Sequence, residues 1–81
     1  MNTHRIYDTF NRRVVSNHRS LRTAVIAARK FQRSVRRSNG QNSYIPIIIE
    51  YLTQGEWVGG YEWIKVPMDE VYDAENAAGI R

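Results

Sequence analysis

The stretch "SLRTAVIAARKFQRSVRRSNG", residues 20–40, decides the fold because it can form one long helix with two opposed faces. At about 100° per residue, apolar side chains gather on one arc and cations gather on the other. The apolar arc consists of Leu21, Ala24, Val25, Ala28, Phe31 and Val35. The cationic arc, which surrounds Ile26, consists of Arg22, Arg29, Lys30, Arg33, Arg36 and Arg37. We therefore predict an amphipathic helix whose polar face is cationic.

The ends of this helix are marked by residue type. Ser20 is a good N-cap, because its hydroxyl can accept from the free N–H groups of the first turn. Asn39-Gly40 is typical of a C-terminal stop. The helix should therefore run from Leu21 to about Ser38.

The segment before the helix predicts a β-hairpin. "HRIYDTF" (4–10) and "RVVSNH" (13–18) are short runs rich in β-branched and aromatic residues. Between them, Asp8 to Arg13 carries turn chemistry, since Asp and Asn can bond to their own backbone. Pairing of the two arms would bring His4 and His18 to the same end.

Two more strands are predicted after the helix. "SYIPIIIEYLT" (43–53) is the first, with Pro46 near its start or on an edge, because proline donates no ladder bond. Gln54-Gly55 favours a turn into "EWVGGYEWIKV" (56–66). Gly59-Gly60 indicates either a bulge in that strand or a second tight turn.

The C-terminal segment predicts a short acidic helix, "MDEVYDAENAAG" (68–79). Pro67 suits its first position, and Asp69 and Glu70 suit the positive end of its dipole. Gly79 ends it. The element order is then ββαββα, a single α+β domain over residues 1–81. An antiparallel sheet of about four strands packs on one long basic amphipathic helix, with the short acidic helix added.

Both later strands are apolar on both alternating faces, whereas an antiparallel strand with one wet face alternates apolar with polar. The long helix can cover one face of the sheet. The C-terminal helix, a second copy of the chain or a ligand must cover the other. The sequence is therefore compatible with a homodimer.

Charge is divided unequally along the chain. Residues 1–40 carry ten basic groups and one acid, and residues 41–81 carry two basic groups and seven acids. Such asymmetry indicates either a half that binds a polyanion or charge pairing within the chain. A solvated helix face is the third interpretation. It is disfavoured because six cations without interleaved Glu lack i,i+4 pairs and repel one another.

Trp57, Tyr61 and Trp63 share one strand parity and are candidate partner-binding residues. Tyrosine and tryptophan are enriched at protein–protein hot spots, and aromatics on a sheet can also stack on unpaired bases. Packing in a core or an interface is the more ordinary role for such a trio.

No catalytic signature, phosphate loop or metal-binding motif occurs, so we expect a non-enzymatic protein without cofactor or metal. His4 and His18 lack a third ligand for zinc. The carboxylates from Asp69 to Glu75 lie on one helix, where neighbouring residues point apart. No motif identifies a family.

Membrane insertion is not expected. The longest apolar run, "IPIII" (45–49), is far shorter than the roughly 20 residues that a spanning helix needs. The N-terminus lacks the apolar stretch of a signal peptide. We expect a cytoplasmic protein.

Two functions follow as hypotheses. The first is a binding protein whose arginine-rich helix face holds an anionic partner, DNA or RNA, with low sequence specificity. The second is a protein-binding inhibitor or adaptor of the kind that phages and mobile elements encode, such as an anti-CRISPR protein. It would act through the aromatic strand face or through the same arginines.

Overall fold

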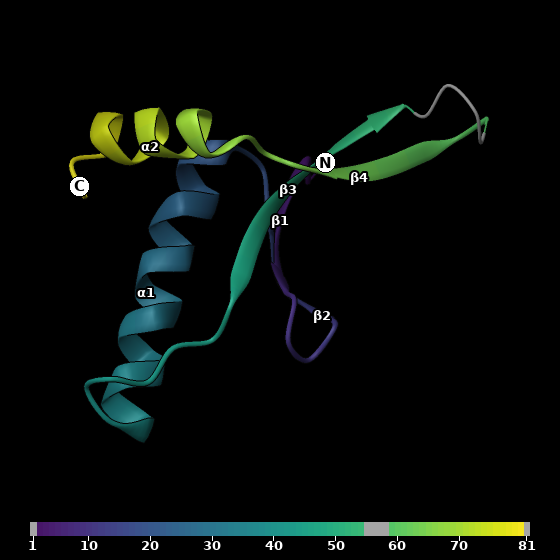
Figure 1. The fold of residues 1–81 in the computed structure, drawn as a ribbon. Helices are drawn as coiled ribbons and strands as arrows, with labels where there is room; N and C mark the ends of the chain where they lie inside the picture. Colours follow the sequence, from purple (N-terminus) through teal and green to yellow (C-terminus); the bar gives the residue numbers. More distant parts are fainter. Residues whose placement is uncertain (1, 55–58, 81) are drawn as a thin grey trace.

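The computed structural model describes residues 2–54 and 59–80 (Figure 1). In chain order the elements are β1 (His4–Asp8), β2 (Arg13–His18), α1 (Leu21–Asn39), β3 (Ile47–Gln54), β4 (Tyr61–Lys65) and α2 (Met68–Ala77). The four strands form one sheet in the order β2-β1-β3-β4, and every neighbouring pair is antiparallel. The predicted α+β architecture and the ββαββα order are confirmed.

The hairpin of β1 and β2 is closed by Asp8. Its buried carboxylate accepts hydrogen bonds from the main-chain N–H groups of Phe10 and Asn11, both at 2.9 Å, and from Asn11 Nδ2 at 2.7 Å. These hydrogen bonds stabilise the charged carboxylate and hold the pKa of Asp8 below its ordinary value, and the bonds from Asn11 have the largest effect. The side-chain-to-backbone hydrogen bonds predicted for the turn from Asp8 to Arg13 are therefore all accepted by the carboxylate of Asp8. The register then sets His4 opposite His18.

The caps of α1 are formed as the sequence predicts. Ser20 Oγ accepts from the main-chain N–H of Thr23 at 3.2 Å, and Thr23 Oγ1 accepts from the N–H of Ser20 at 3.3 Å. This reciprocal pair is a capping box with Thr in place of the usual Glu or Gln. At the other end Gly40 has φ 112° and donates its N–H to the carbonyl of Arg36 at 2.9 Å.

The later strands are shorter than predicted. β3 begins at Ile47, directly after Pro46, so the strand start predicted at residue 43 is wrong. Among the described residues β4 begins at Tyr61. Gly59-Gly60 precedes β4, and Gly59 has φ 64°, which glycine adopts readily. The pair therefore belongs to the connection and is not a bulge in β4. The part of the predicted strand at 56–58 lies outside the described residues.

α2 follows Pro67, which is the N-cap residue and not the first helical residue as predicted. Its end is set by Gly79 at φ 73°. The chain reverses there, so that the N–H of Ile80 donates to the carbonyl of Glu75 at 3.1 Å. Ile80 itself packs against the core. This combination is a Schellman-type ending with its apolar contact.

The core lies between the two helices and one face of the sheet. Its central buried side chains are Ala24, Val25, Ile49 and Val66. The partly buried residues around them are Leu21, Ala28, Tyr51, Val71, Ala74, Ala78 and Ile80. Both helices thus pack against the same face, and α2 crosses the N-terminal half of α1 (Figure 1). Because α2 packs on the same face as α1, it does not cover the second face of the sheet, and this part of the prediction is wrong. No helix within residues 2–54 and 59–80 is long and apolar enough to cross a membrane.

Gly79→Ala tests the ending of α2. A Cβ at this position meets no atom within 4 Å, so only the left-handed backbone is strained. We expect a loss of about 1 kcal/mol in the free energy of unfolding, measured with urea, and a smaller loss for Gly79→Asn, because Asn tolerates this conformation better. Equal stability of wild type and Gly79→Ala would contradict the assigned ending.

Candidate nucleic-acid interface

The predicted cationic residues form a continuous stripe on the solvent side of α1. We call this set the cationic stripe: Arg22, Arg29, Lys30, Arg33, Arg36 and Arg37. All six are exposed. Because α1 is a regular helix, the stripe from Arg22 to Arg37 extends over roughly 22 Å at about 1.5 Å per residue. Arg36 and Arg37 also lie in the last turn, where positive charge stabilises the helix dipole.

The C-terminal half of the stripe surrounds a shallow hollow. Lys30, Arg33, Ser34 and Arg37 line it, and its volume is about 250 Å³. These residues follow the i, i+3, i+4, i+7 spacing that puts side chains on one helix surface. Three cations around a hydroxyl offer charge-assisted donors to an oxyanion such as a phosphate group. No acidic residue within the described chain lines the hollow.

The acidic helix α2 lies mainly beside the edge of the stripe formed by Arg29 and Arg36, away from the hollow around Ser34. Glu75 of α2 lines a groove together with Arg29 and Arg36. Asp69, Glu70 and Asp73 are exposed on α2, which crosses α1 near its beginning (Figure 1). The sequence left open whether the acidic half covers the basic face. In the fold Glu75 of α2 reaches the groove edge of that face, and all six cations of the stripe remain exposed.

The predicted aromatic trio is only partly described. Trp57 lies outside the described residues. Tyr61 and Trp63 occupy the same face of β4, with Tyr61 70% exposed and Trp63 half-buried. Trp63 lies under the guanidinium of Arg5, whose Cζ is 4.3 Å from the ring centroid. Trp63 is therefore engaged within the fold, whereas Tyr61 is open to solvent.

Arg5 is the centre of the sheet face that the helices leave uncovered. Its Nε donates to Glu50 Oε1 at 2.7 Å, and its guanidinium also lies 5.5 Å from the ring of Tyr7. The Arg5 and Glu50 side chains are 20% and 14% exposed. Sequence reasoning missed this cluster, because the register that places Arg5 opposite Glu50 joins strands 45 residues apart. The available signal was the lone Glu50 within the apolar run at the beginning of β3.

The histidine pair forms at the open end of the hairpin. His4 Nδ1 is 2.9 Å from Thr3 Oγ1, and His18 Nε2 is 2.7 Å from Ser16 Oγ. Burial lowers the pKa of both histidines, and the neighbouring His18 lowers that of His4 further. Among the described residues no three His, Cys, Asp or Glu side chains gather as metal ligands.

No known protein family, characterised protein or solved structure matches the chain.

Acidification should destabilise the protein through His4 and His18. Their pKa values in the folded chain lie below the ordinary 6.5, so the unfolded chain binds more protons once the pH falls below that value. Stability is complete above pH 6.5 and decreases as the pH falls toward the folded pKa values. Urea midpoints measured across this range should show the decrease. The double variant His4→Gln/His18→Gln should show a flatter profile, and an unchanged profile would assign the dependence to other groups.

Arg5→Met should destabilise the fold by about 1–3 kcal/mol, because it leaves the Glu50 carboxylate half-buried without its charged donor. Arg12→Met, at an exposed arginine of the hairpin turn, is the matched control and should change stability by less than about 0.5 kcal/mol. Urea unfolding measures both variants. Equal losses in the two variants would show that the Arg5 cluster does not stabilise the sheet.

Proposed function

We propose that the protein binds nucleic acid through the cationic stripe of α1. The observation that carries the proposal is that all six cations of the stripe are exposed along one regular helix. DNA and RNA present phosphates at regular intervals, and a row of Lys and Arg side chains gains affinity by neutralising them and releasing counterions. Such contacts position a protein on the backbone without reading sequence.

Arginine suits this role better than lysine does. Its planar guanidinium can donate two parallel hydrogen bonds to one phosphate, and five of the six stripe residues are arginine. The hollow around Ser34 adds a local concavity to the otherwise convex helix surface. Binding is therefore expected to be electrostatic, tolerant of sequence and strongly dependent on salt.

The charge pattern of α1 favours a binding role for the stripe over an ordinary solvated face. No Glu or Asp occurs in α1, so the cations have no partners one turn away within their own helix. Their mutual repulsion disfavours the isolated helix, and an anionic partner would relieve it. The helix is instead held by its caps and by the packing of its apolar side on the core.

A second candidate function is the binding of a protein partner. The observation that favours it is the sheet face opposite the helices, where Tyr7, Ile48 and Leu52 are only half-buried. A homodimer through this face would be compatible with either function. Capture of a defined host protein after nuclease treatment would support this candidate, and recovery of nucleic acid alone would support the first.

Arg33→Glu/Arg37→Glu should abolish most nucleic-acid binding. For four to six neutralised phosphates, the wild-type slope of log K against log salt should be roughly −3.5 to −5.5. Loss of two contacts should reduce the slope by about 1.8 and the affinity at about 50 mM salt by roughly 100-fold or more. Fluorescence anisotropy with a labelled short DNA duplex, and with RNA of the same length, measures both quantities.

Arg12→Glu/Arg19→Glu is the charge-matched control, because both residues are exposed and lie outside α1. The two double variants change the net charge equally, so a specific role of the stripe predicts a much smaller effect for the control. Equal losses would show that only total charge matters. A flat salt response of the wild-type protein would overturn the proposal itself.

A further inference from the structure

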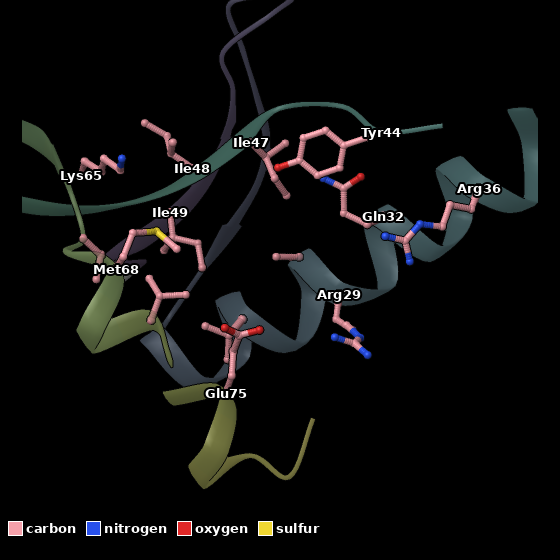
Figure 2. A pocket seen from close by; sticks show the side chains of 14 residues that line it. Arg29, Gln32, Arg36, Tyr44, Ile47, Ile48, Ile49, Lys65, Met68 and Glu75 are labelled. Atoms are coloured by element: carbon pink, nitrogen blue, oxygen red, sulfur yellow. The ribbon is translucent and has the colours of Figure 1, made fainter. Parts of the chain in front are cut away.

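A groove of about 590 Å³ lies between α1, α2 and the beginning of β3. It reaches round the edge of β3: Figure 2 shows Ile48 and Lys65 on one side of the strand, with Ile49 and Met68 on the other. The groove is separate from the hollow around Ser34, since no residue lines both.

The edge of β3 inside this groove is open. β4 pairs with Glu50 to Gln54 only, whereas β3 begins three residues earlier, at Ile47. The main-chain groups of an antiparallel strand alternate in direction from one residue to the next. Pro46 O and Leu52 N bond toward β1, and Ile49 O accepts from Val66 N on the opposite side. By this alternation the N–H and C=O of Ile47 point away from β1, into the groove.

Both flanking positions on this edge already have partners. At Ile45 the side chain of Gln32 acts as a strand would: its Nε2 donates to the carbonyl at 2.6 Å, and its Oε1 accepts from the N–H at 3.4 Å. At Ile49 the N–H of Val66 bonds to the carbonyl at 2.8 Å. Ile47 is the position between these two partners. Its main-chain N–H and carbonyl have no partner on this side among the described residues, and they match one residue of an extended peptide.

The surroundings of Ile47 define the chemistry of an occupant. Apolar side chains of the groove can receive the alternate side chains of an extended segment: Val25, Ala28, Ile49, Met68 and Val71. Arg29, Arg36 and Lys65 bring three cations to the groove, against the single carboxylate of Glu75. In Figure 2, Arg29 and Arg36 lie on α1 and Lys65 lies near β3, so positive charge stands at both ends. The complementary ligand is extended, apolar on alternate residues and acidic.

We propose that this groove binds an extended acidic peptide segment of a protein partner, which pairs with β3 at Ile47. Main-chain hydrogen bonds to Ile47 provide the register, and the apolar side chains of the groove provide contact area. Carboxylates of the peptide meet Arg36 and Lys65. A peptide fits better than a nucleic acid, because a phosphate backbone offers no N–H donor to the Ile47 carbonyl and gains little from an apolar floor.

The probe is a labelled short peptide of alternating valine and glutamate, titrated into the full chain by fluorescence anisotropy. Saturable binding is expected, together with a shift of the Ile47 amide signal in nitrogen-15 NMR spectra. The same peptide with lysine in place of glutamate should not bind. A version methylated on alternate backbone nitrogens, which cannot pair along one edge, should bind about tenfold more weakly.

Lys65→Glu should weaken the peptide about tenfold, whereas Lys30→Glu, on the stripe but outside the groove, should not. Nucleic-acid binding should show the opposite pattern, so the failure of either proposal can be recognised without the other. If Lys65→Glu does not fold, the wild-type protein still tests the inference, through its affinity for the methylated peptide and through the shift of the Ile47 amide signal. Equal binding of the methylated and unmethylated peptides, or an unshifted Ile47 amide, would overturn the inference. The inference would also be overturned if DNA, but not the peptide, shifted the Ile47 amide signal.

Discussion

The packing of α1 against one face of the sheet is the constraint on which the rest of the structure depends. Ala24 and Val25 are almost fully buried against Ile49 and Val66, and α2 attaches to the same cluster. Apolar burial is the main favourable contribution to folding, and a chain of this size has few side chains to supply it. Because this small core fixes the rotation of α1, it also fixes where every cation on that helix points.

The packing of α1 also determines which surfaces of the protein carry the cationic stripe, the Arg5–Glu50 pair and the groove. With the apolar arc of α1 on the core, the cationic stripe is turned outward, and Glu75 of α2 lies at its groove edge. On the far side of the sheet, burial of Arg5 and Glu50 is tolerated because each satisfies the other and because Trp63 covers the guanidinium. One chain thus presents an open cationic helix and, beside it, a groove that combines apolar walls with a free strand edge.

Sequence reasoning predicted the elements whose signals are local. The period of α1, its Ser20 cap and its Gly40 stop depend on residues within one or two turns, and all three are confirmed. The bounds of β3 and β4 were placed less well, because apolar runs such as "IPIII" continue beyond the residues that find a ladder partner. The Arg5–Glu50 pair and the groove at Ile47 could not be predicted, since both need the register between strands far apart in the chain.

The sequence by itself determined the element order, the two faces of α1 and the exclusively positive charge of its outer face, because each follows from residue type and helical period. The tertiary structure decided three further matters. It placed α2 on the same side of the sheet as α1, engaged Trp63 beneath Arg5, and left β3 unpaired at Ile47. These features arise from the meeting of distant segments, and strand register and helix crossing are set by the packing of the core and not by any local pattern.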